Sequence, residues 1–208
     1  MPRPKERNLL EAALLNIEVV VDAATTSEAI ASIPVIGTAF KVCKAIDDIR
    51  ARALAVKLHG FVSEPGLTSV AAKTALAQKL RDSPDEARKV GETLFLVLDR
   101  FIDLDKPALM AKVFVAYLHD VVPARELQRL AQAIDIAFAE DLKALVEADE
   151  FCVFGNSKED AYAPWRKMLL PSGLTINNAG GVTVVKTSYD VTPLGQSLWK
   201  ALHHVPKA

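Results

Sequence analysis

A single segment near the C-terminus carries the β-strand signal of this chain, and it constrains the fold more than any other feature. Residues 182–191 are rich in β-branched side chains, which favour extended backbone. Ile176 can begin a partner strand, and the intervening residues 177–181 include two glycines that suit a hairpin loop. Thr192 suits the N-cap of a following helix, with Pro193 at its first position. The pattern predicts a β-hairpin that leads directly into a capped helix.

Helical periodicity covers most of the remaining sequence. Half of the residues are hydrophobic and only 6% are aromatic, which is typical of packed helices. Apolar residues recur at helical spacing in segments 8–24, 34–62, 68–80, 83–101, 106–119, 123–138, 140–150 and 157–170. The connections between residues 68 and 150 are very short. Because short connections favour antiparallel neighbours, we expect a compact bundle there.

Prolines, glycines and capping residues set the predicted boundaries. Ser83-Pro84, followed by two acidic residues, is a clear helix start, whereas Pro65-Gly66 is interpreted as a stop. Residues 151–156 are interpreted as a loop, and Pro164 as a kink or a delayed start in the helix of residues 157–170. The predicted fold is mainly α, with N-terminal long helices (1–65), a compact multi-helix bundle (66–150) and a small α+β module (157–208).

Net charge and cysteine usage narrow the class of protein. A net charge of -1 gives the whole molecule no electrostatic attraction to nucleic acid or to an anionic membrane. Cys43 and Cys152 lie far apart without CxxC spacing, so we expect free thiols and a cytoplasmic location. Since no stretch reaches about eighteen uninterrupted apolar residues, we expect no integral membrane segment.

No motif in the sequence assembles a catalytic, metal or cofactor site. The four histidines occur without an HExxH pattern or a Cys/His cluster, and glycine-rich phosphate loops are missing from the sequence. Paired acids such as Asp103 and Asp105 are explained by solvated charges at helix ends. We therefore expect a protein that is not an enzyme, without a cofactor, a bound metal or a small-molecule substrate.

Residues 157–202 resemble the corresponding part of bacterial winged-helix proteins. Tyr189–Leu198 is similar to the stretch that closes the wing and opens the last helix in that superfamily, an aromatic-x-Leu/Val-Thr-x-x-Gly-x-x-Leu pattern. Leu169-Leu170 followed by Gly173-Leu174 is similar to the end of the recognition helix entering the first wing strand. The resemblance implies a winged-helix-like module. The preceding bundle looks like uncharacterised small bacterial helical proteins, a likeness that implies no activity.

Winged-helix modules contact DNA with the helix that precedes the wing, so the resemblance makes nucleic-acid binding one function to test. The basic residues that could contact phosphates are Arg166, Lys167, Lys186 and Lys200. The predicted helix begins, however, with residues 157–160, which include Glu159 and Asp160. Two carboxylates against the DNA backbone would weaken binding. The sequence therefore favours another function for this module.

The leading prediction is a non-enzymatic interaction protein that uses the wing and the last helix for protein contact or self-association. Its predicted anchors are Trp165, Tyr189 and Trp199, because aromatic side chains concentrate binding energy at interfaces. The alternative for Trp165 and Trp199 is that they form the core of the small module. Two other functions stay open: a nucleic-acid-binding transcriptional regulator, and a membrane-active effector of a bacterial defence system that uses residues 9–21 and 33–46 as amphipathic segments.

Overall fold

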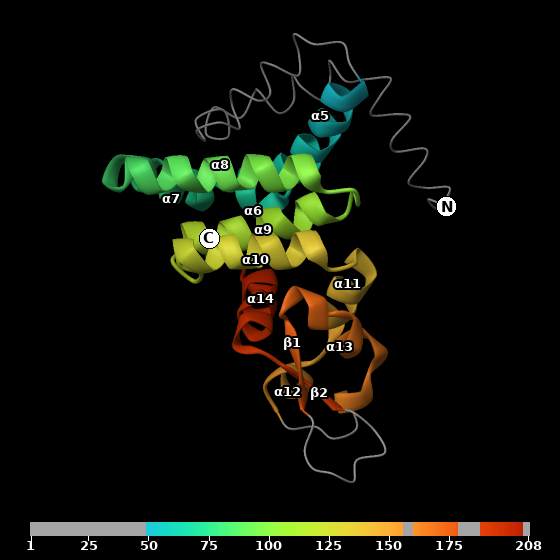
Figure 1. Cartoon of the computed structure of the whole chain (residues 1–208). Coiled ribbons are helices and arrows are strands. Elements are labelled where there is room, and N and C mark those ends of the chain that lie inside the picture. Colours follow the sequence, from blue (N-terminus) through green and yellow to red (C-terminus); the bar gives the residue numbers. More distant parts are fainter. Residues whose placement is uncertain (1–48, 156–159, 179–187, 206–208) are drawn as a thin grey trace. The chain divides into compact units, whose positions relative to one another are not determined.

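The computed structural model describes residues 49–155, 160–178 and 188–205 (Figure 1). Within these residues the protein is mainly helical, with a small two-stranded antiparallel sheet near the C-terminus, which confirms the predicted mainly α fold class. The predicted helix of residues 8–24 and the first part of the helix predicted for residues 34–62 lie outside the described residues. In the part of the chain that is described, no helix is long and apolar enough to cross a membrane.

The chain divides into two compact units. The division falls between Ala111 and Lys112, inside helix α9 (Lys106–Leu118). It coincides with neither of the boundaries predicted near residues 65 and 150. The described residues are 49–111 in the N-terminal unit and 112–155, 160–178 and 188–205 in the C-terminal unit.

The N-terminal unit packs its helices around an apolar interior. These helices are α5 (Ile49–Val62), α6 (Pro65–Thr68), α7 (Val70–Asp82) and α8 (Pro84–Arg100), followed by the first part of α9. Helix α8 contacts both α5 and α7. The fully buried side chains at its centre include Leu58, Phe61, Leu94 and Leu98. Because burying each such side chain contributes about 1.5–3 kcal/mol, this packing of α8 supplies much of the stability of the unit.

Local signals explain where these helices begin. Helix α8 begins at Pro84 as predicted, with two acidic residues in its first turn near the positive end of the helix dipole. Helix α7 begins after Ser69, whose hydroxyl accepts a hydrogen bond from the backbone N–H of Ala72 at 3.1 Å. Helix α5 ends at Val62, as predicted, but Pro65-Gly66, interpreted as a stop, begins the short helix α6. Proline is tolerated there, since the first N–H of a helix has no helical partner.

The C-terminal unit joins further helices to the small sheet. After α9 come α10 (Ala124–Ile136), α11 (Ala139–Glu147), α12 (Glu150–Phe154), α13 (Pro164–Met168), β1 (Thr175–Asn178), β2 (Ser188–Val191) and α14 (Pro193–His203). Single 3-10 turns cover Asp160–Tyr162 and Leu170–Ser172. Helix α14 contacts α10, α11 and α12. The interior of the unit contains the fully buried Leu130, Ile134, Leu142, Leu145 and Leu198.

The predicted hairpin and its capped helix are both present. Strands β1 and β2 pair antiparallel, with Thr175 opposite Val191. Asn177 and Asn178, predicted as loop residues, are the last residues of β1. The loop itself and residues 182–187 of the predicted strand lie outside the described residues. Thr192 caps α14 as predicted, because its hydroxyl accepts a hydrogen bond from the N–H of Gly195 at 3.1 Å.

The predicted loop of residues 151–156 is wrong over α12, because the carboxylate of Asp149 accepts a hydrogen bond from the N–H of Cys152 at 2.8 Å and caps a helix there. In the helix predicted over residues 157–170, Pro164 was expected to be a kink or a delayed start, and the delayed start is confirmed. Helix α13 starts only at Pro164, because the residue before a proline is driven to extended backbone, as Ala163 is here.

Candidate protein interface on the C-terminal unit

Arg166, a predicted phosphate contact, lies in the interior of the C-terminal unit. Its side chain is only 3% exposed. The guanidinium donates hydrogen bonds to the carbonyl oxygens of Cys152 at 2.7 Å and of Tyr189 at 3.1 Å. It also lies 5.1 Å from the centre of the Trp165 ring, within cation–π range. Arg166 therefore ties α12, α13 and β2 together, and its charged group does not face solvent.

Two other predicted basic residues lie among the described residues. Lys167 is exposed on α13. Lys200 is exposed on α14, with its ammonium 5.0 Å from the centre of the Phe154 ring. Lys186 lies outside the described residues, as do residues 9–21 and 33–46 of the membrane-active alternative. Of the predicted phosphate contacts that the structure describes, Arg166 is therefore buried, and Lys167 and Lys200 are exposed.

An aromatic ridge runs across α12 and α14, and we define it as Phe151, Phe154, Trp199 and His203. The Phe154 and Trp199 rings meet edge to face, with centres 5.6 Å apart and planes at 83°. The Trp199 and His203 rings stack with centres 3.9 Å apart. Phe151 lies one turn before Phe154 on α12, where residues three apart are neighbours, and its side chain is 70% exposed. Ring contacts join Phe154, Trp199 and His203, and the exposed side chains of the ridge are Phe151 and His203.

Hydrogen bonds hold the centre of the aromatic ridge in place. The indole N–H of Trp199 donates to the carbonyl oxygen of Ala148 at 2.9 Å. Nδ1 of His203 lies 2.9 Å from the carbonyl oxygen of Trp199, one helical turn earlier. Trp199 is thus half-buried and held on two sides, and it belongs both to the core of the unit and to its surface. These contacts agree with the alternative that Trp199 belongs to the core of the small module, and its role as an interface anchor stays a prediction.

The other two predicted anchors, Trp165 and Tyr189, are also half-buried, and both take part in the contacts of Arg166. Phe151 and Phe154 were not predicted as site residues, because their segment was interpreted as a loop. The spacing of two phenylalanines three residues apart after a capping aspartate was the signal that could have found them.

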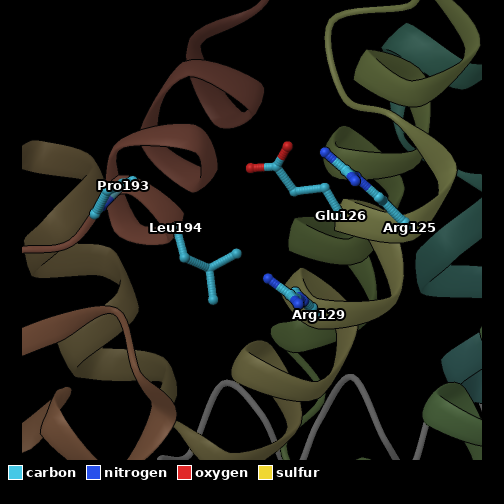
Figure 2. A pocket seen from close by; sticks show the side chains of 5 residues that line it. All are labelled: Arg125, Glu126, Arg129, Pro193 and Leu194. Carbon is cyan, nitrogen blue, oxygen red and sulfur yellow. The ribbon is translucent and has the colours of Figure 1, made fainter.

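A pocket of about 360 Å³ lies between α10 and α14 (Figure 2), and no residue of the aromatic ridge lines it. It is lined by Arg125, Glu126 and Arg129 from α10 and by Pro193 and Leu194 from α14. The side chains of Arg129 and Leu194 point toward each other across it (Figure 2). The sequence analysis did not select these residues, because α10 and α14 are far apart along the chain.

Two histidines meet where α9 and α14 end. The rings of His119 and His204 have centres 5.4 Å apart. Nε2 of each ring is buried without a hydrogen-bond partner. Burial, and then the charge of His119, lower the pKa of His204 from its ordinary value of 6.5.

The described residues bring no three His, Cys, Asp or Glu side chains together in a geometry that could hold a metal ion. Comparison with known proteins found no matching family model, no similar curated protein and no similar solved structure.

Proposed function

We propose that this chain is a non-enzymatic interaction protein whose C-terminal, winged-helix-like unit binds another protein through the aromatic ridge. The observation that carries the proposal is the gathering of aromatic rings on α12 and α14: Phe154, Trp199 and His203 contact one another, and Phe151, one turn before Phe154, is 70% exposed. Aromatic side chains are enriched in the buried centres of protein interfaces, and tryptophan is prominent among residues that dominate binding energy.

The way Trp199 is held makes it suited to binding. An exposed side chain loses conformational freedom when a partner immobilises it, at a cost of about 0.5–1.5 kcal/mol. Trp199 has already lost that freedom through its hydrogen bond to Ala148 and its contacts with Phe154 and His203. A partner that covers the ridge therefore gains apolar contact area with little further ordering. Lys200, at the edge of the ridge, adds a polar rim.

The order of elements in the C-terminal unit supports a winged-helix-like assignment, since α11, α12 and α13 precede the hairpin and α14 follows it. Two features favour protein contact over nucleic-acid binding. Helix α13, in the place of a recognition helix, has five residues and so spans only about 7 Å, too short to follow a major groove. Its Arg166 is buried against backbone carbonyls rather than available to phosphates.

Replacing Phe151 with alanine tests the proposal, because this ring is exposed and its loss should leave the fold intact. The matched control is Phe138→Ala, which removes a ring of similar exposure, 67%, at the start of α11 and outside the aromatic ridge. Self-association of the full chain is measured by light scattering over a wide concentration range. Partner binding is measured as the amount of each co-purifying protein that the wild-type chain and the two variants retain. Truncating a side chain that contributes to a binding surface costs about 1 kcal/mol or more, so Phe151→Ala should weaken association about fivefold or more.

The outcomes separate the alternatives. Association that is lost in Phe151→Ala and kept in Phe138→Ala supports the ridge. A wild-type chain that stays monomeric and retains no protein, or two variants that behave alike, contradicts it. A titration with duplex DNA at low salt runs in parallel, because a salt-dependent complex would favour the nucleic-acid-binding alternative.

A further inference from the structure

The pocket between α10 and α14 contains two arginine side chains that bind no other group in the described part of the chain. Arg125 and Arg129 lie four residues apart on α10, and both side chains are exposed. Within the described part of the chain, neither guanidinium forms a hydrogen bond or an ion pair. Glu126 also lines the pocket, but it is not close enough to either arginine to pair with it.

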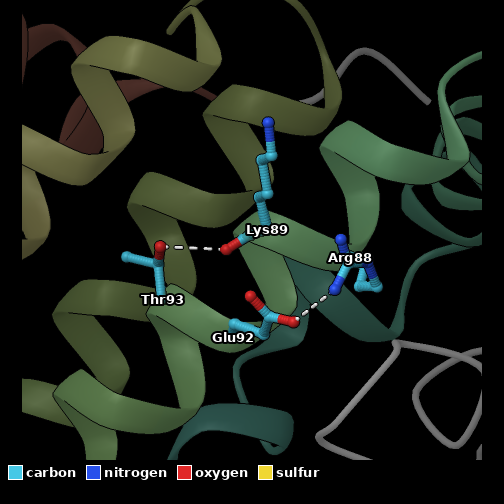
Figure 3. A network of polar contacts seen from close by, with 4 residues as sticks. All are labelled: Arg88, Lys89, Glu92 and Thr93. Atoms are coloured by element: carbon cyan, nitrogen blue, oxygen red, sulfur yellow. Dashed lines mark hydrogen bonds and ion pairs between the residues drawn. The ribbon is translucent and has the colours of Figure 1, made fainter.

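This placement of two arginines is unfavourable for an isolated helix. Like charges four residues apart repel each other, and a positive side chain in the first turn, where Arg125 lies, opposes the helix dipole. Helix α8 shows the usual arrangement, in which Arg88 donates a hydrogen bond to Glu92 at 3.0 Å (Figure 3). An anion between Arg125 and Arg129 would remove the repulsion on α10.

The opposite wall of the pocket is apolar. Pro193 and Leu194 line it from the first turn of α14. At about 360 Å³ the pocket is near the lower end of the range of about 300–1,000 Å³ for ligand pockets, so it suits a few side chains rather than a large molecule. The ligand that fits has a carboxylate with an apolar group beside it.

We propose that this pocket binds an acidic peptide segment of a protein partner. A glutamate or aspartate of the partner lies between Arg125 and Arg129, and a neighbouring apolar side chain packs against Pro193 and Leu194. Glu126 repels a densely charged polyanion such as nucleic acid, whereas it can accept a hydrogen bond from a peptide N–H. The inference rests on the proposed protein-binding function, and it assigns the partner a chemical character.

The pocket and the aromatic ridge are separate sites on α14. Leu194 and Trp199 are five positions apart, which places them about 140° apart around the helix axis. A partner that contacts both would therefore wrap around α14. Each site can be altered without touching the other, and this makes the two proposals independently testable.

Fluorescence anisotropy of the full chain with labelled peptides tests the pocket. The probe is a fluorescein-labelled peptide of alternating glutamate and leucine, and two comparison peptides replace the glutamates with lysine or the leucines with serine. The pocket variant is Arg125→Gln with Arg129→Gln. Its matched control is Arg81→Gln with Lys89→Gln, which removes the same charge from exposed residues of α7 and α8.

The glutamate–leucine peptide should bind the wild-type chain and the control with equal affinity. Its affinity for the pocket variant should be lower, by at least about tenfold for each hydrogen bond to a charged group that is lost. The lysine peptide should not bind, and the serine peptide should bind more weakly. Equal affinity for the pocket variant and the control, or no binding of the glutamate–leucine peptide to the wild-type chain, would overturn the proposal. If that happens while Phe151→Ala still abolishes association, only the pocket proposal fails and the ridge stands.

Discussion

Replacement of Arg166 by methionine should destabilise the C-terminal unit, whereas the same change at the adjacent Lys167 should have little effect. Arg166 donates two hydrogen bonds to the carbonyl oxygens of Cys152 and Tyr189, and its side chain is buried. Methionine retains most of the apolar volume but cannot donate, so both carbonyls lose this partner. Lys167, exposed on the same helix, makes no comparable contact.

The magnitude follows from the two bonds. Hydrogen bonds to a charged group contribute about 1.5–3 kcal/mol each, which suggests a loss of roughly 3–6 kcal/mol. Removing a buried charge also returns part of its desolvation cost, so the lower end of that range, about 3 kcal/mol, is the expected value. For exposed Lys167 the expected change is within about 0.5 kcal/mol.

Urea unfolding followed by tryptophan fluorescence measures this loss in the C-terminal unit alone. The chain has two tryptophans, Trp165 and Trp199, and both lie in that unit. With an unfolding slope of about 1–2 kcal/mol per molar urea for a unit of this size, the midpoint of Arg166→Met should fall by about 1.5–3 M. Lys167→Met should stay within about 0.5 M of the wild type.

A urea midpoint for Arg166→Met equal to that of the wild type would mean that the hydrogen bonds of Arg166 do not stabilise the unit. If that variant also loses salt-dependent DNA binding while remaining stable, Arg166 faces nucleic acid, and the protein-binding proposal loses its main argument against that alternative.

Two further predictions concern close packing and pH. Gly195→Ala should destabilise the protein by about 1–3 kcal/mol, because the added Cβ would collide with the carbonyl oxygen of Leu174 and lie 2.7 Å from Cγ1 of Val191. Gly60→Ala is the control: its Cβ would lie 3.5 Å from Pro107, so the change should be neutral or mildly stabilising. Melting temperatures measured by circular dichroism compare the two variants, and equal values would show that α14 can shift. The lowered pKa of His204 means that the unfolded chain binds its proton more tightly, so stability should fall as the pH drops through and below 6.5. His204→Phe should flatten that decline in urea midpoints read by tryptophan fluorescence, and an unchanged pH profile would count against the role of the His119–His204 contact.

Much of the fold could be predicted because its signals are local. The start of α8 at Pro84 and the capped start of α14 at Thr192 depend on a few neighbouring residues, and both were found. Strands β1 and β2 also followed from their own composition and the glycines between them. Errors arose where one residue outweighed the periodic pattern. Asp149 caps α12 in a segment interpreted as a loop, and Pro65 begins α6 where a stop was predicted.

The candidate sites were less predictable than the elements, because they depend on burial and on contacts between distant segments. Local patterns in the chain are enough to establish a mainly helical protein with a hairpin and a capped last helix, since hydrogen bonds within a helix or a turn join near neighbours. Packing determines that the guanidinium of Arg166 meets the carbonyl of Cys152, and that Phe154 meets Trp199. The sequence does not distinguish a charged residue that is buried from one that is exposed. Only the tertiary structure shows that Arg166, predicted as a DNA contact, is buried and hydrogen-bonded inside the unit. Only the tertiary structure shows, too, that the α10 arginines and Leu194 line one pocket.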